Sequence, residues 1–390
     1  MNYSFSHRIA SLQPSIIREI LKATSGQNVI PFSAGNPAPE TFPIEAIRSF
    51  TKDILEQDPV TALQYGITEG YFPLRQALTD HLKSGFNTGQ ASDGLFIVSG
   101  AQQGIELACK VFCNEGDTII CESPSFIGSL NSFRSSGARL VGVPMEPDGI
   151  NLDRLEHALK TEPNVKLIYL IPSFQNPTGI TTSLEKRKAV YALAKRYEVV
   201  ILEDNPYGEL RFSGEDVPTI KSLDDAGLVI YVGSFSKILS AGLRVGFVLA
   251  PDEIVQKMVV AKQGEDVHTA MLPQILAYKF MKEYDYAGHV ALIREVYLRK
   301  CTLMTDSMKQ YTDGSMAYTR PDGGLFLWCE LPPSVTMLDY CKLAAAKGVA
   351  VVPGSAFLVD PDEPCNAIRL NFSTPSDEQI VKGIQILGQI

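Results

Sequence analysis

The apolar run LVIYVG is followed by four side chains that could do chemistry together: Ser234, Ser236, Lys237 and Arg244. A lysine among apolar neighbours loses stability as an ammonium ion and becomes a nucleophilic amine. Hydroxyls and a guanidinium bind phosphate well. A single lysine is more often a surface residue whose stem packs while its ammonium stays in water, so this group needs support from elsewhere in the chain.

Three other apolar runs also end in polar residues. Residues 99–104 (SGAQQG) follow LFIVS and open a predicted helix, whose free N–H groups attract phosphate. Asn176 follows VKLIYLI within FQNPTG, and its amide is a candidate ligand donor. Asp204 and Tyr207 follow VVIL and supply a carboxylate and a phenol. Taken singly, each of these segments could be only a helix cap or a turn.

The elements that position these side chains are short β-branched runs that alternate with helical stretches. VKLIYLI and EVVILED are apolar on both faces, which is typical of parallel strands covered by helices on each side. We therefore predict a doubly wound α/β body, in which the residues after each strand meet at one edge of the sheet. The predicted strands are 95–99, 117–121, 139–143, 165–171, 199–203, 228–233 and 245–250.

The last third of the chain has a different pattern. From about Pro251 it predicts two long helices that end near Tyr311, followed by short strands at 324–330, 349–352 and 367–372. A chain of 390 residues is long for a single core. We predict an N-terminal arm over 1–39 that packs with the small domain, a large domain over 40–285, and a small α+β domain over 286–390.

Composition narrows the class of protein. The chain is 45% hydrophobic and 20% charged, as in ordinary globular enzymes, and its net charge of 35 − 44 = −9 opposes binding to nucleic acid or anionic lipid. No signal peptide and no apolar stretch of membrane-spanning length is found. The seven cysteines lie in apolar context without zinc-like spacing, so we expect them to be reduced and expect no metal site. These features predict a cytoplasmic protein.

Together the four polar segments supply what pyridoxal 5′-phosphate (PLP) requires. The set comprises an amine for an imine, a carboxylate for the ring nitrogen, a phenol and an amide for the ring oxygen, and hydroxyls plus arginine for the phosphate. The chain resembles the class I aminotransferases of fold type I. The resemblance spans nearly the whole sequence, through GNPAPETFP, LQYGITEG, SGAQQG, FQNPTG, EDNPY, GSFSK and IRLNF. It implies a fold with a mostly parallel sheet in a large domain and a smaller α+β domain.

The resemblance implies a role for each matching residue. Lys237 would hold PLP as a Schiff base and later move the substrate proton, and Asp204 would pair with the pyridine nitrogen. Asn176 and Tyr207 would bond the phenolic oxygen of PLP. The phosphate would be held by Ala101, Gln102, Ser234, Ser236 and Arg244.

Two aromatic residues also match the family. Phe126 stands where the family most often has a tyrosine stacked on the pyridine ring, so stacking is kept but a hydroxyl is lost. Tyr65 would reach the phosphate in a neighbouring subunit. The resemblance therefore implies a homodimer with active sites at the interface.

The substrate side of the site is implied less directly. Arg369 matches the arginine that binds the substrate α-carboxylate, since a planar guanidinium suits two-point recognition of a carboxylate. Gly35 and Asn176 would also line the substrate site. Arg18 stands where the branch of 2-aminoadipate and kynurenine aminotransferases has an arginine facing the substrate side chain; otherwise it is a solvated helix residue. The expected reaction moves an amino group between an amino acid and a 2-oxo acid such as 2-oxoglutarate, by a ping-pong mechanism.

Two alternatives share this site. The same branch includes the aminotransferase-like half of MocR-type regulators, in which PLP serves a ligand sensor beside a DNA-binding module. That reading is disfavoured because the chain begins directly with the predicted arm and is acidic. A PLP β-lyase would differ in its products, because it releases pyruvate and ammonia.

Overall fold

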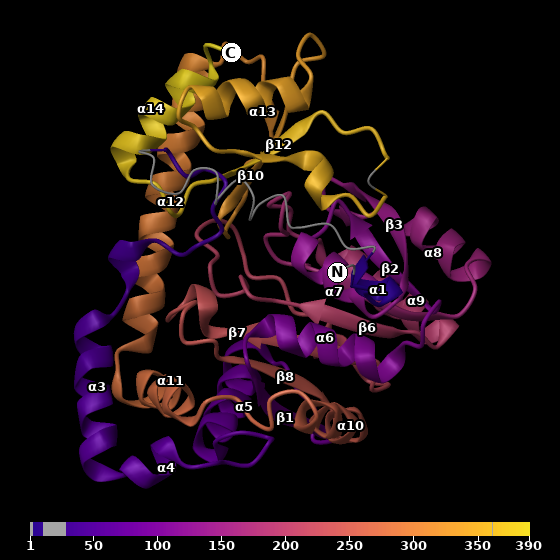
Figure 1. The fold of residues 1–390 in the computed structure, drawn as a ribbon, viewed down its shortest axis with the longest axis vertical. Coiled ribbons are helices and arrows are strands. Elements are labelled where there is room, and N and C mark those ends of the chain that lie inside the picture. The colour runs from indigo at the N-terminus through magenta and orange to yellow at the C-terminus, as the bar shows by residue number, and fades with distance from the viewer. Residues whose placement is uncertain (1–2, 11–28, 361) are drawn as a thin grey trace.

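The computed structural model describes residues 3–10, 29–360 and 362–390, so the predicted substrate residue Arg18 lies outside the described residues. Within this part of the chain, eight strands form a larger sheet and four form a smaller one. Figure 1 shows the larger sheet flanked by helices, with the smaller sheet at the top of the view beside α13 (Met337–Ala346) and α14 (Asp377–Leu387).

The larger sheet is mixed but mostly parallel, as predicted. Strands β2, β3, β5, β6 and β7 pair in parallel, whereas β8 pairs antiparallel with both β1 and β7. In the described chain the order is β1-β8-β7-β6-β5-β2-β3-β4. The bounds are β1 (Asp93–Val98), β2 (Thr118–Ser123), β3 (Arg139–Glu146), β4 (Gly149–Ile150), β5 (Val165–Leu170), β6 (Val200–Asp204), β7 (Val229–Ser234) and β8 (Gly246–Pro251).

Both faces of this sheet are buried because its strands are apolar on both faces. Ile119 and Cys121 join the core on the side of α6 (Ala101–Phe112) and α7 (Ile127–Ser135). Ile120 points the other way and packs with Leu155 of α8 (Leu152–Thr161) and Val190 of α9 (Leu184–Tyr197). Each such side chain contributes about 1.5–3 kcal/mol on burial, which fixes the register of the strands.

Further helices enclose the edge of the sheet near β1. Helix α11 packs against α3, α4 and α5, and α10 packs against α6 and β1. These elements lie in the lower part of Figure 1. The bounds are α3 (Ile44–Gln57), α4 (Pro59–Leu63), α5 (Phe72–Phe86), α10 (Asp252–Gln263) and α11 (Met271–Glu283).

The helical segment after Pro251 contains three helices, α10, α11 and α12 (Tyr286–Tyr311), so the prediction of two was wrong. Residues 264–270 separate α10 from α11, and residues 284–285 separate α11 from α12. At the second interruption the Asp285 side chain accepts a hydrogen bond from the Gly288 amide and so begins α12. Helix α12 then runs to the smaller sheet, where it packs against α14 (Figure 1).

The smaller sheet is antiparallel and has the order β11-β12-β10-β9. Its strands are β9 (Ala317–Tyr318), β10 (Phe326–Glu330), β11 (Val352–Pro353) and β12 (Ala367–Asn371). The chain before α3 lies against this sheet: Ile30 forms a parallel bridge with Val349, and the Asn371 amide donates to the Phe32 carbonyl. The predicted boundaries between the arm, the large domain and the small domain, after residues 39 and 285, stay a prediction.

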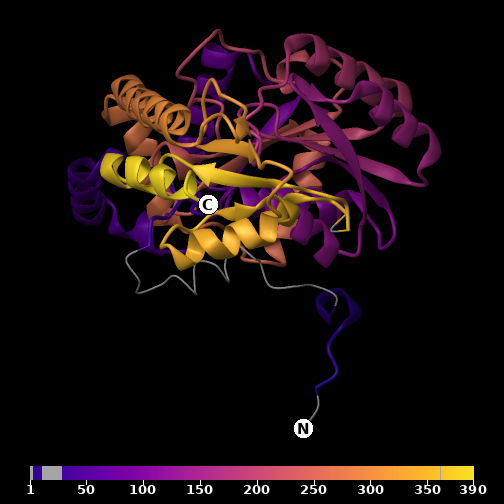
Figure 2. The same ribbon diagram turned by 90° about the horizontal axis from the view of Figure 1, so that it is seen from above.

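The described N-terminal residues lie at the edge of the molecule. Helix α1 (His7–Ala10) contacts α7, and Figure 2 shows residues 3–6 leading away from the body. None of the described helices is long and apolar enough to cross a membrane. The described residues also contain no cluster of three or more His, Cys, Asp or Glu side chains arranged to hold a metal. All seven cysteines are free.

Candidate active site

A cavity of about 480 Å³ opens beyond the carboxyl ends of β5, β6 and β7. The larger sheet supplies one wall, while the segment before α3 and strands β10 and β12 of the smaller sheet supply the other. The residues that line it are Gly35, Asn36, Ala101, Gln102, Ile105, Phe126, Ile171, Asn176, Asp204, Pro206, Tyr207, Ser234, Ser236, Lys237, Arg244, Phe326 and Arg369. Among the predicted site residues that the structure describes, it therefore brings together all except Tyr65.

Lys237 ends the 3₁₀ turn η3 (Phe235–Lys237), which follows β7 directly. The turn begins at Ser234, whose hydroxyl accepts a hydrogen bond from the Ser236 amide and so bends the chain into the cavity. The Lys237 amine donates to the Gly35 carbonyl at 2.6 Å. Burial, followed by the charges of Arg369 and Arg244, lowers the pKa of Lys237 to about 8. The amine is therefore much easier to deprotonate than that of a surface lysine.

Asp204 is the last residue of β6 and is 3% exposed. Its Oδ2 accepts a hydrogen bond from the Tyr169 hydroxyl at 2.8 Å, whereas its Oδ1 has no hydrogen-bond partner among the described residues. Burial raises the pKa of Asp204 to about 7. A buried acceptor without a partner costs about 1–3 kcal/mol, so this oxygen is suited to a donor that a ligand brings.

Arg369 projects from β12 and is 2% exposed. Its guanidinium donates to Asn176 Oδ1 at 3.0 Å and to the Ser33 carbonyl at 2.9 Å, and it lies 4.2 Å from the centroid of the Phe326 ring. Its Nε has no hydrogen-bond partner within the part of the chain that the structure describes. Burial lowers the pKa of Arg369 to about 10, so the group stays cationic at neutral pH. A buried cation with an unused donor is suited to an anionic ligand.

Tyr207 lies beside this arginine and is also buried. Its ring meets the Phe326 ring edge-on, with centroids 6.0 Å apart. Burial raises the pKa of the Tyr207 hydroxyl, which therefore keeps its proton and can donate a hydrogen bond. On the other side of the cavity, Phe126 precedes α7 and is half-buried.

Hydroxyls, a guanidinium and a helix start meet at one end of the cavity. Ser234 Oγ donates to Ser236 Oγ at 2.9 Å, and neither hydroxyl has another side-chain partner among the described residues. The N-terminus of α6 presents Ala101 and Gln102. This is the donor set that binds a phosphate dianion.

Gly100 allows the Arg244 guanidinium to lie close to the backbone at this end of the cavity. It lies immediately before α6 and has a φ of +84°. A Cβ atom at this position would collide with the guanidinium of Arg244. Only glycine permits both this backbone angle and this contact without strain.

The predicted residue Tyr65 does not line this cavity. It is 81% exposed, and its ring contacts His268 edge-on with centroids 5.7 Å apart. Sequence reasoning missed the lining residues Asn36, Ile105, Ile171, Pro206 and Phe326. Asn36 and Pro206 lie within quoted motifs and could have been found there, whereas Ile105, Ile171 and Phe326 carry no polar signal.

The nucleophilic amine, the buried carboxylate with a free oxygen and the phosphate-binding end fit PLP and define a PLP-dependent enzyme. The chain belongs to the family of aminotransferases of class I and II, whose family model matches residues 27–387. It is therefore a PLP-dependent aminotransferase.

Several relatives are similar over nearly the whole chain. An aromatic-amino-acid aminotransferase of Thermococcus litoralis is 39% identical, over 99% of this chain and 93% of its own. A 2-aminoadipate transaminase of Thermus thermophilus is also 39% identical, over 99% and 96%. The crystal structure of a Pyrococcus horikoshii kynurenine aminotransferase is 35% identical, with a TM-score of 0.95 and coverage of 99% and 96%. An uncharacterized HTH-type transcriptional regulator of Bacillus subtilis is more distant, at 31% identity over 96% of this chain and 76% of its own.

Proposed function

We propose that this aminotransferase acts on amino acids with large aromatic or acidic side chains, with 2-oxoglutarate as one amino acceptor. The observation that carries this proposal is the single cavity that Lys237, Asp204 and Arg369 line together. The names of the relatives, which act on aromatic amino acids, 2-aminoadipate and kynurenine, support the substrate class. We further propose a cytoplasmic location, supported by the seven free cysteines.

When bound, PLP supplies an aldehyde that exchanges imine partners and a protonated pyridine ring that accepts the electrons of a broken Cα–H bond. Lys237 Nζ, with its lowered pKa, would hold the cofactor aldehyde carbon and would accept the proton that leaves the substrate α-carbon. Asp204 Oδ1 would accept a hydrogen bond from the protonated pyridine nitrogen. Tyr207 and the amide of Asn176 would donate hydrogen bonds to the phenolic oxygen.

The remaining residues bind and orient. Ser234, Ser236 and Arg244, with the first amides of α6 at Ala101 and Gln102, hold the phosphate. Phe126 packs on the ring face. Arg369 binds the substrate α-carboxylate with the help of Asn176, and Gly35 lines the same side of the cavity.

The proposed function is tested by mixing the PLP form with single amino acids and following its absorbance change to the amino form. We expect the aromatic amino acids, 2-aminoadipate and glutamate to convert the cofactor, and 2-oxoglutarate to restore it. Release of pyruvate and ammonia instead of amino-group exchange would indicate a β-lyase. Failure of all these amino acids would contradict the proposed substrate class.

Arg18 is proposed to recognise acidic side chains. An ion pair closed away from water contributes about 1.5–3 kcal/mol, so Arg18→Ala should lower kcat/KM for 2-aminoadipate or glutamate about tenfold to a hundredfold. The value for leucine or methionine should change little. Equal losses for acidic and apolar substrates would assign Arg18 a purely structural role.

The active site is proposed to be completed in a homodimer. Tyr65 is exposed and outside the cavity of its own chain, and the segment 60–72 that contains it also exposes the apolar side chains of Val60, Leu63, Ile67 and Phe72. We expect light scattering to give about twice 42.7 kDa and Tyr65→Phe to weaken PLP retention. Phe72→Tyr, which adds a hydroxyl at another exposed aromatic residue of this segment, is the matched control. A fully active monomer would contradict this proposal.

A further inference from the structure

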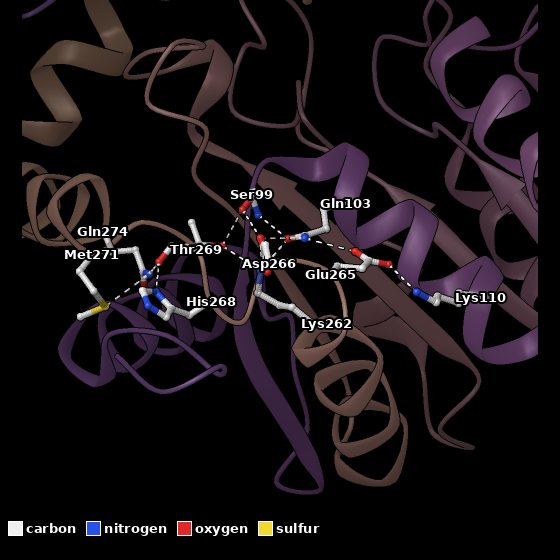
Figure 3. Close-up of polar contacts among 10 residues, drawn as sticks. All are labelled: Ser99, Gln103, Lys110, Lys262, Glu265, Asp266, His268, Thr269, Met271 and Gln274. Carbon is white, nitrogen blue, oxygen red and sulfur yellow. Dashed lines mark hydrogen bonds and ion pairs between the residues drawn. The ribbon is translucent and has the colours of Figure 1, made fainter. Parts of the chain in front are cut away.

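Ser99 belongs to a network of polar side chains (Figure 3). Through its carbonyl it also contacts Arg244, which lines the proposed phosphate-binding end of the cavity. Ser99 is the residue before Gly100, and all of its polar groups are used. Its carbonyl accepts from Arg244 Nη2 at 3.2 Å, and its amide donates to Gln103 Oε1 at 2.8 Å. Its hydroxyl donates to Asp266 Oδ2 at 2.8 Å. The conformation of the turn and the place of the Arg244 guanidinium therefore depend on Gln103 and Asp266.

Lys262 holds both of these acceptors. Its side chain is fully buried at the end of α10, and its ammonium donates to Gln103 Oε1 and Asp266 Oδ1, both at 2.7 Å. It also donates to Thr269 Oγ1 at 3.1 Å. Burial acts to raise the pKa of Asp266, but hydrogen bonds from Lys262, Gln103 and Ser99 hold it below its usual value. A buried cation is tolerated only with such partners, so the network is fixed in one arrangement.

The loop that carries Asp266 is also anchored away from the cavity. His268 Nε2 accepts from the Gly66 amide at 3.3 Å, and Gln274 Nε2 donates to the Thr269 carbonyl at 2.6 Å. Gln274 Oε1 in turn accepts from the Tyr71 amide. Because these contacts do not involve Lys262, loss of the lysine should loosen Ser99 without releasing the whole loop.

We propose that Lys262 and Asp266 are positioning residues that hold the Ser99–Gly100 turn and Arg244 in the arrangement that receives the cofactor phosphate. This inference rests on the proposed function of that turn as the phosphate site. Neither side chain lines the cavity. Their effect is therefore on the geometry of the phosphate donors and leaves the aldehyde and ring contacts of PLP in place.

The test compares two ligands of the cofactor-free enzyme: PLP and pyridoxal, which has the same ring and aldehyde but no phosphate. We expect Lys262→Met to weaken PLP binding about tenfold to a hundredfold and pyridoxal binding by less than about threefold. Asp266→Asn should act in the same direction. In the double variant the two losses should not add, since each removes the same ion pair. Dissociation constants come from absorbance titrations.

Asp266→Asn separates positioning from simple charge. If the pair acted only through its electrostatic field, loss of the negative Asp266 would tighten PLP binding, whereas positioning requires weaker binding. Lys110→Met is the matched control, because Lys110 pairs with Glu265 of the same loop at 3.1 Å and does not contact Ser99. It should leave both affinities unchanged.

Arg244→Met provides the reference for the phosphate site itself. Suppose that Arg244→Met weakens the binding of PLP but not of pyridoxal, whereas Lys262→Met and Asp266→Asn leave the ratio of the two affinities unchanged. The proposed phosphate site would then be supported, and our inference about Lys262 and Asp266 would be wrong. If Arg244→Met itself leaves that ratio unchanged, the proposed phosphate site is wrong. Equal losses for both ligands in Lys262→Met would show a general structural role, which also overturns the inference.

Discussion

Lys237→Ala is expected to abolish turnover, with a loss of at least about a thousandfold, while part of the affinity for PLP remains. Among the described residues that line the cavity, Lys237 is the one lysine, so the substitution removes both the amine proposed to bond the cofactor and the group proposed to carry the proton. The proposed phosphate and ring contacts come from other residues and are untouched. Single-turnover rates with 2-aminoadipate or an aromatic amino acid, with absorbance to measure retained PLP, check this result.

The fold of this variant should be intact. Among the described residues, the Lys237 amine donates one hydrogen bond, to the Gly35 carbonyl, and burial lowers its pKa and so opposes its charge. Circular dichroism and thermal unfolding of the cofactor-free protein should therefore match wild type closely. Near-wild-type transamination by Lys237→Ala would refute the assignment of this residue.

Much of the site could be predicted because parallel strands bring their carboxyl ends together. Strands β6 and β7 pair in parallel, with Asp204 opposite Val232, so the residues that follow both strands reach the same cavity. The polar residues after each apolar run were visible in the sequence. The general rule for α/β sheets thus placed Asp204, Tyr207 and Lys237 together without any homologue.

Arg369 could not be placed by that rule. It lies in the other sheet and meets Asn176 across a separation of 193 residues, and only the resemblance to the family linked the two. Phe326, which packs on the Arg369 guanidinium, could not be predicted either, because an apolar residue in a short strand gives no sign of lining a site. Contacts between the two sheets depend on how the sheets pack against each other, and hydrophobic periodicity does not encode that packing.

The polar network around Lys262 could not be predicted from the sequence for a different reason. A lysine near the end of a helix is normally solvated, and nothing local marks this one as buried. Its burial follows from the packing of α10 against α6, which brings Gln103 within reach. The division of the segment after Pro251 into three helices was also not predicted; at one of the two breaks, capping by Asp285 is only a single-residue signal inside a long helical pattern.

Asp204→Asn should lower the rate of amino-group transfer about a hundredfold to a thousandfold, the usual range for losing a group that stabilises charge in the transition state. Asparagine keeps the shape of the side chain and can still accept the hydrogen bond from Tyr169. It lacks the negative charge that holds a proton on the pyridine nitrogen. Half-reaction rates within a few-fold of wild type would show that this carboxylate has a different role.

The same substitution should stabilise the protein when the cofactor is absent. Burial raises the pKa of Asp204 from 3.8 to about 7, so the folded state holds the proton more tightly than the unfolded chain. Stability from this group is full below pH 3.8 and is lost as the pH rises through 7. At about 1.4 kcal/mol per pKa unit, the difference between 3.8 and about 7 makes the cost of the ionised carboxylate about 4 kcal/mol.

Urea unfolding of the cofactor-free protein separates this cost from catalysis. Asp204→Asn should be more stable than wild type by about that amount at pH 8 and nearly equal to it at pH 4, where the wild-type carboxyl is protonated in the folded state. Tyr169→Phe is the matched control, because it removes the hydrogen bond to the carboxylate and keeps the charge. If the stability difference between Asp204→Asn and wild type did not change with pH, the conclusion that burial destabilises the charged carboxylate would be wrong. A gain at pH 8 with loss of activity would show that the folded protein tolerates this charge because PLP chemistry needs it.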